Sequence, residues 1–194
     1  LHDAYYSGDF SQASILQIVA SDRLQNSGDA FISETADNVL SKLKFLRKGS
    51  KAPAICLKNT DGNKHCSDEN NNKFKYLIFA DTEMIVCREH LKYLTKIENQ
   101  FREHLEIIIV LRNTNRLEMK AFLTEEEIPG KHLVDKNGEY IGKYRVKSYP
   151  TSILLNENHE VVFKQARAPL DGFEQQFGAF LQKELFLRQR NQDR

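Results

Sequence analysis

Two short apolar runs separated by an amphipathic segment constrain the fold of this chain more than any other feature. The runs span residues 76–80 and 107–111, and each has the length of a buried strand. Between them, residues 84–105 place Cys87, Leu91 and further apolar side chains at spacings of three and four, as on one face of a helix. A strand, a helix and a second strand in this order predict an α/β domain.

The flanking segments extend this pattern. Residues 54–58 and 64–68 flank the turn sequence Thr60-Asp61-Gly62-Asn63 and are predicted to form a hairpin. Further along, the pattern predicts helices at 116–123, 140–146 and 173–185, and paired strands at 152–155 and 161–164. The predicted fold is therefore a mixed β-sheet with helices on both faces.

The first 47 residues differ from the rest of the chain, because they carry helical spacing and no strand signal. We predict three parts: a helical N-terminal arm at 1–47, an α/β domain at 48–187, and a charged tail at 188–194 that frays. The arm needs something to pack against, and we expect it to pack on the domain. The chain begins at Leu1, and we expect a native signal peptide to have been trimmed before it.

Composition argues against several classes of function. Lys plus Arg number 28 and Asp plus Glu number 27, a net charge of +1, whereas binding to nucleic acid or to a membrane surface needs a basic excess or patch. No apolar run approaches the length of roughly 18 residues that marks a membrane span. The histidines lack metal-ligand spacing, and glycine-rich phosphate loops are absent. We expect no metal, no cofactor and no nucleic-acid partner.

Four motifs, in their order and spacing, resemble the thioredoxin superfamily, and in particular the TlpA-like or redoxin thiol-disulfide proteins of the bacterial cell envelope. They are the entry hairpin at 49–63, the F-x-A-x-W-C-x-x-C-R type segment at 79–88, the Y-x-V-x-x-x-P-T loop at 144–151, and the closing hairpin at 156–162. The resemblance covers residues 48–187. It implies a thioredoxin-like fold, a cis peptide bond before Pro150, and a periplasmic or lipid-anchored location in the cell envelope.

The chain departs from this family at the residues that perform its chemistry. Cys87 falls on the second cysteine of the C-x-x-C motif, and Met84 falls on the first. In the family the first thiolate attacks a substrate disulfide and the second cysteine resolves the mixed disulfide. A thioether neither ionises nor forms a disulfide, and Glu83 replaces the family's aromatic residue with a charge that disfavours a thiolate. The resemblance therefore implies that dithiol turnover is lost.

The three cysteines leave alternatives open. Cys87 is either a reactive lone thiol near a helix start or a buried remnant on the apolar stripe with Leu91, and we favour the remnant. If Asn59 pairs with Asn63 across the hairpin turn, Cys56 stands opposite Cys66. Opposed strand residues have Cβ atoms about 4.5–5.5 Å apart, slightly wide for a disulfide, but an envelope location would permit oxidation. A structural disulfide and two independent thiols both remain possible.

The resemblance also implies a binding surface. In such folds the loop that matches Tyr149-Pro150-Thr151 faces the start of the active helix and holds extended peptide through backbone hydrogen bonds. The candidate surface is Met84, Tyr149, Pro150 and Thr151. The alternative is that Pro150 only fixes a turn.

We therefore predict a redox-degenerate thioredoxin-fold protein of the bacterial cell envelope that acts as a binding or scaffold module. Its expected partner is an extended peptide or another envelope protein. The alternative is an enzyme, a one-cysteine thiol oxidoreductase or peroxidase-like protein with Cys87 as its catalytic residue. The accessibility and ionisation of the Cys87 thiol distinguish the two hypotheses.

Overall fold

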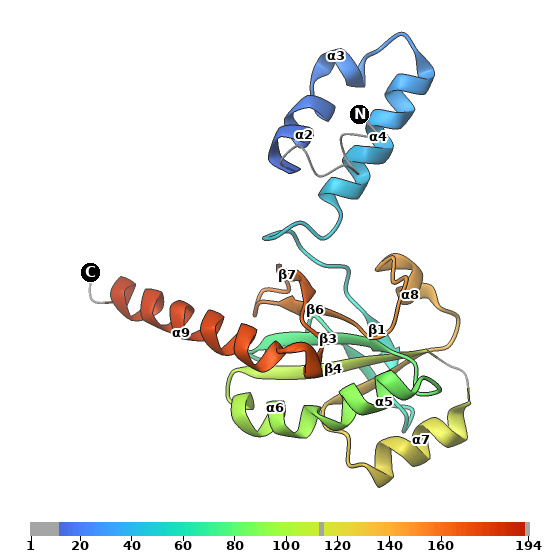
Figure 1. The fold of residues 1–194 in the computed structure, drawn as a ribbon, viewed down its shortest axis with the longest axis vertical. Coiled ribbons are helices and arrows are strands. Elements are labelled where there is room, and N and C mark those ends of the chain that lie inside the picture. The colour runs from blue at the N-terminus through green and yellow to red at the C-terminus, as the bar shows by residue number, and fades with distance from the viewer. Residues whose placement is uncertain (1–11, 113–114, 193–194) are drawn as a thin grey trace. The chain divides into compact units, whose positions relative to one another are not determined.

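The computed structural model describes residues 12–112 and 115–192 of the chain, which divides into two compact units between Arg47 and Lys48. In the first unit the described residues form α2 (Gln12–Val19), α3 (Asp22–Gln25) and α4 (Ala30–Lys44) (Figure 1). The helix α4 begins where the Asp29 carboxylate accepts a hydrogen bond from the Phe31 backbone N–H at 2.9 Å, an N-cap. Residues 1–11 of the predicted arm lie outside the described residues.

These helices bury a small apolar core of their own. Ile15 and Val19 of α2 pack with Ala36 and Val39 of α4, and all four side chains are buried. The spacing of three and four between these positions places them on facing stripes of the two helices. The helical character predicted for this part of the chain is confirmed over the residues that the structure describes.

The second unit is built on a five-stranded sheet with the order β5-β4-β3-β6-β7. The strands are β3 (Phe74–Ala80), β4 (Leu105–Arg112), β5 (Lys131–Asp135), β6 (Thr151–Leu155) and β7 (Val161–Ala166). Strands β3, β4 and β5 run parallel, whereas β6 pairs antiparallel with both β3 and β7. Every residue of β3 is buried, as expected for the central strand of a sheet covered on both faces. The prediction of a mixed sheet is confirmed.

Helices cover both faces of this sheet. One face packs against α5 (Ile85–Lys92), α6 (Leu94–Phe101), α7 (Arg116–Glu125) and α9 (Phe173–Gln192), which share one apolar core with Tyr76 and Ile78 of β3. On the opposite face, the ring of Phe79 lies 5.0 Å from that of Tyr144, at the end of α8 (Glu139–Lys143). Figure 1 shows α5, α6 and α7 below the sheet and α8 above it.

Three sequence predictions need correction. The segment 84–105 is not one helix but two, because the chain breaks at Tyr93 and Leu105 already belongs to β4. The strand β5 was not predicted, because its apolar run is only Leu133-Val134 between polar neighbours, and pairing with β4 creates the strand. The predicted frayed tail is helical as far as the structure describes it, since α9 continues to Gln192 and Arg188 pairs with Glu157 at 2.5 Å.

Among the helices of the described ranges, none combines the length and the apolar character that crossing a bilayer requires.

Candidate functional site

The turn that joins β3 to α5 is held by a buried acidic residue, Asp81. Its backbone carbonyl accepts a hydrogen bond from the Met84 N–H at 3.1 Å, and its carboxylate accepts one from the Glu83 N–H at 3.0 Å. The turn ends at Met84, which is the N-cap residue of α5 and makes no side-chain capping hydrogen bond. The first backbone N–H groups of α5 are thus left for other partners, as at any helix start without a side-chain cap.

The loop that contains Pro150 lies beside this turn. Strand β6 pairs antiparallel with β3 so that Thr151 is opposite Phe79, which places the residues before Thr151 next to the residues after Phe79. The peptide bond between Tyr149 and Pro150 is cis, and Thr151 donates a hydrogen bond from its hydroxyl to the Ser148 carbonyl at 2.6 Å. The structure therefore brings Met84, Tyr149, Pro150 and Thr151 into one region.

Cys87 lies in the first turn of α5 but faces the core. Its side chain is 0% exposed and packs in the same apolar cluster as Leu91 and Leu94, with the half-buried Tyr149 against it. Burial raises the pKa of the Cys87 thiol above its ordinary value, and this effect outweighs the hydrogen bond to the Asp81 backbone, which acts in the opposite direction. At neutral pH the thiol is therefore protonated and shielded from solvent.

The exposed face of the same helix start is apolar. Met84 is 39% exposed, Ile85 is 78% exposed and Val86 is 45% exposed. Ile85 and Val86 were not predicted as site residues, because they lie off the apolar stripe that indicates the helix. We call the six residues Met84, Ile85, Val86, Tyr149, Pro150 and Thr151 the loop–helix surface.

An ion pair under this surface was not predicted either. An Arg112 Nη1–H donates to the Asp81 carboxylate at 3.0 Å, and only 3% of the Asp81 side chain is exposed. Asp81 follows β3 and Arg112 ends β4, and the carboxyl ends of neighbouring parallel strands meet at one edge of a sheet. The sequence feature that could have indicated this ion pair is the charged residue that directly follows each apolar run, Asp81 after 76–80 and Arg112 after 107–111. The pair fixes the turn before α5.

The other two cysteines lie in a separate hairpin. The strands β1 (Cys56–Lys58) and β2 (Lys64–Cys66) pair with Cys56 opposite Cys66, so the predicted register is confirmed. Gly62 has a φ of +95°, the left-handed conformation that the turn requires. In the structure the two sulfurs are joined by a disulfide of 2.06 Å. Asp68 reaches within 4.8 Å of both sulfurs, but the disulfide already engages the two sulfurs that a metal ion would need.

This disulfide predicts a simple labelling pattern. When the oxidised protein is denatured with iodoacetamide and digested without reductant, a single cross-linked species should join residues 56 and 66, and Cys87 alone should be alkylated. Mass spectrometry of the digest detects the cross-linked species and the alkylated Cys87 peptide. Prior treatment with dithiothreitol is the control and should expose all three thiols. Alkylation of all three without reductant would show that the hairpin is not cross-linked.

Comparisons with known proteins identify a family and several similar proteins for the second compact unit. The AhpC/TSA family model matches residues 48–164. The thiol-disulfide oxidoreductase ResA of Halalkalibacterium halodurans is 26% identical over 126 residues, which cover 64% of this chain and 72% of that protein.

Two solved structures show the same fold. The thioredoxin domain of a thiol-disulfide oxidoreductase from Bacteroides vulgatus has a TM-score of 0.60 at 21% identity, covering 67% of this chain and 95% of that one. A thiol:disulfide interchange protein from Bacteroides sp. has a TM-score of 0.59 at 23% identity, covering 68% and 90%.

The predicted thioredoxin-like fold is confirmed by these structures together with the sheet topology. The family match starts at the boundary between the two compact units and extends through β3, α5, the cis-proline loop and most of β7. It covers more than half of the chain, and the protein therefore belongs to the AhpC/TSA family.

Proposed function

We propose that this protein is a redox-degenerate thioredoxin-fold protein of the bacterial cell envelope that acts as a binding or scaffold module. One observation carries the proposal: Met84 occupies the N-cap of α5, where the resembling thiol-disulfide proteins place their attacking cysteine, and the one cysteine of this helix is buried. The chain keeps the fold and the cis-proline loop of those proteins but not their first thiol.

The dithiol reaction has no route at this position. In the exchange cycle a thiolate at the helix start bonds to one sulfur of the substrate disulfide, and the second cysteine then displaces it to form the protein disulfide. The Met84 thioether has no S–H proton to lose, so it forms neither a thiolate nor a disulfide. The Cys56–Cys66 pair does not replace it, because those residues are ten positions apart in a hairpin and not at a helix start.

The one-cysteine alternative is opposed by the environment of Cys87. A peroxidase-like or mixed-disulfide reaction needs a thiolate that solvent can reach. The Cys87 side chain has no exposed area, and burial raises its pKa. Both properties act against the same reaction, so we place Cys87 in the core and not in a catalytic role.

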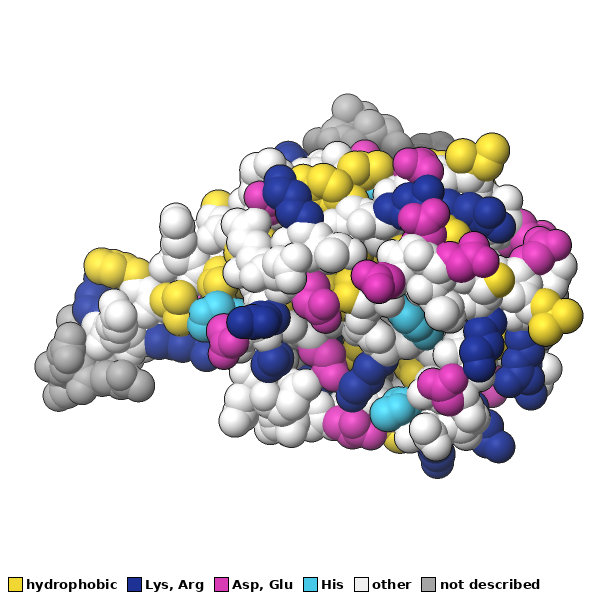
Figure 2. All heavy atoms as spheres, turned by 90° about the horizontal axis from the view of Figure 1, so that it is seen from below, with side chains coloured by type: hydrophobic (Ala, Val, Ile, Leu, Met, Phe, Trp, Pro, Cys, Tyr) yellow, Lys and Arg dark blue, Asp and Glu magenta, His cyan; other side chains and the backbone are white. Residues whose placement is uncertain are grey.

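The loop–helix surface supports binding of an extended peptide. Its exposed apolar side chains Met84, Ile85 and Val86 follow the turn after β3, and the Tyr149–Thr151 loop leads into β6, which pairs with β3. Recognition of an extended peptide combines backbone hydrogen bonds with apolar side-chain pockets. Figure 2 shows Lys and Arg interspersed with Asp and Glu on the face seen there, so that this face carries no single basic patch of the kind that binds nucleic acid. The envelope location rests on the family resemblance and on the hairpin disulfide, which forms in oxidising compartments.

We test this proposal with phage-displayed random peptides selected on the intact protein. Selected peptides should bind in solution, and Ile85→Lys should weaken their binding at least about tenfold, because a charge replaces the most exposed of the three apolar side chains at the helix start. Fluorescence anisotropy of labelled peptides measures the Kd. Leu117→Lys is the matched control, since Leu117 is an exposed leucine (84%) near the start of another helix, α7. Equal weakening by both variants, or none by Ile85→Lys, would argue against the proposal.

A further inference from the structure

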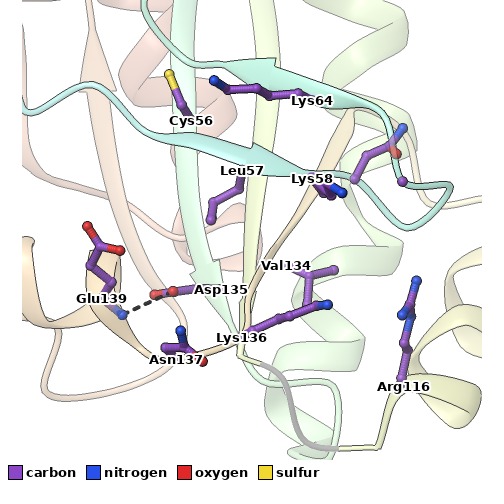
Figure 3. A pocket seen from close by; sticks show the side chains of 12 residues that line it. Cys56, Leu57, Lys58, Lys64, Arg116, Val134, Asp135, Lys136, Asn137 and Glu139 are labelled. Atoms are coloured by element: carbon purple, nitrogen blue, oxygen red, sulfur yellow. Dashed lines mark hydrogen bonds between the residues drawn. The ribbon is translucent and has the colours of Figure 1, made fainter.

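A pocket that shares no residue with the loop–helix surface lies at the same edge of the sheet. This pocket of about 410 Å³ is formed by the β1–β2 hairpin, the end of β5, and the starts of α7 and α8. Leu57 of the hairpin and Val134 of β5, both labelled in Figure 3, contribute apolar side chains to the lining of the pocket. The volume is within the range of roughly 300–1,000 Å³ that small-molecule sites occupy.

The two carboxylates that line this pocket are already engaged. Asp135 is buried and accepts hydrogen bonds from the backbone N–H groups of Glu139, Tyr140 and Ile141 at 2.9–3.0 Å, so it caps α8. The Glu139 carboxylate pairs with Lys143 at 2.6 Å. Among the described residues, neither carboxylate forms an ion pair with Lys58, Lys64, Arg116 or Lys136.

Four cations line the same pocket without partners. They are Lys58 and Lys64 of the hairpin, Arg116 of α7, and Lys136 after β5. Within residues 12–112 and 115–192, none of the four makes an ion pair or a hydrogen bond through its side chain. In Figure 3 the side chains of Lys58, Arg116 and Lys136 come from three different elements to the same opening.

The hairpin places two like charges opposite each other. Lys58 and Lys64 are directly opposite each other across the ladder, and like charges in that position destabilise a strand pair. Each strand has only three residues, and an isolated two-stranded ribbon of that length is marginal in water. The disulfide at the other end of the ladder holds the hairpin closed and keeps the two lysines in place without a ligand.

We propose that this pocket binds a small organic anion that carries at least two phosphate or carboxylate groups. The anionic groups contact Lys58, Arg116 and Lys136, and the apolar part of the ligand lies against Leu57 and Val134. The site is at the edge of the sheet where the parallel strands β4 and β5 end, which is the edge where open α/β sheets bind ligands. This inference does not depend on the proposed peptide binding, because the two sites share no residue.

The test titrates the intact oxidised protein with inorganic pyrophosphate and, separately, with citrate. We expect saturable binding of at least one of them by isothermal calorimetry, and the stronger of the two identifies phosphate or carboxylate as the preferred group. Acetate, with one charge, should bind much more weakly. Lys58→Gln combined with Lys136→Gln should weaken binding at least about tenfold, because charge-assisted hydrogen bonds are the strong ones.

Two further variants make the result decisive. Lys183→Gln is the matched control, because Lys183 is an exposed lysine of α9 outside the pocket, and it should leave the affinity unchanged. Arg116→Gln should weaken binding by itself, and it changes no residue of the hairpin. Binding of neither anion at millimolar concentration, or equal loss in Lys183→Gln, would overturn the proposal.

Discussion

Replacing Met84 with cysteine is expected to give this protein a disulfide-exchange activity that, under our proposal, the native chain does not have. The new thiol would stand at the N-cap of α5, where unpaired backbone N–H groups and the helix dipole stabilise a thiolate. Cys87 lies three residues further along and would resolve the mixed disulfide. The measurement is the reduction of insulin disulfides by dithiothreitol, for which the native protein should not exceed the rate of the reagent alone.

The variant should exceed that rate by roughly tenfold or more, and Glu83 should keep it below an ordinary thioredoxin, because a neighbouring negative charge disfavours the thiolate. The control is Met84→Cys combined with Cys87→Ala, which has no resolving thiol and, in its reduced form with dithiothreitol removed, should trap a mixed disulfide with the substrate. Native turnover comparable to that of a thioredoxin would refute the loss of dithiol chemistry. An inactive Met84→Cys protein with a native fold would show that the helix start does not have the geometry that we assign to it.

Cys87 is expected to react with iodoacetamide at least about a hundredfold more slowly in the native protein than in denaturant at pH 7. The thiol has no exposed area, so alkylation must wait for an opening of the structure. Burial also raises its pKa, which lowers the fraction of thiolate at pH 7 relative to the unfolded chain. Helix-dipole stabilisation acts in the opposite direction but is typically below about 1 kcal/mol at an exposed site, so burial dominates.

Alkylation is followed by intact mass against time, with the disulfide left oxidised so that Cys87 is the one free thiol among the described residues. A denatured sample at the same pH supplies the reference rate. Labelling of native protein within seconds, or accumulation of sulfenic acid with stoichiometric peroxide, would support the one-cysteine enzyme in place of the binding module.

The elements whose signal is local could be predicted from the sequence by itself. The apolar runs at 76–80 and 107–111 are the cores of β3 and β4, and the turn around Gly62 predicted the hairpin register residue by residue. A turn type defines register because it decides which residues stand opposite each other. The same register put Cys56 opposite Cys66 but left two thiols or a disulfide equally open, because sequence spacing does not report sulfur positions.

The remaining features were decided by tertiary contacts. The strand β5 forms because Leu133 and Val134 pair with β4. The last part of α9, which ends at Gln192, carries Arg188, and Arg188 forms an ion pair with Glu157. The pairing of Asp81 with Arg112 needs two strands to end at one sheet edge. The loop–helix surface likewise depends on β6 lying antiparallel to β3, which brings Pro150 to the start of α5 from a distant part of the chain. Local periodicity carries no information on such contacts, because they form between residues that only the folded chain brings together.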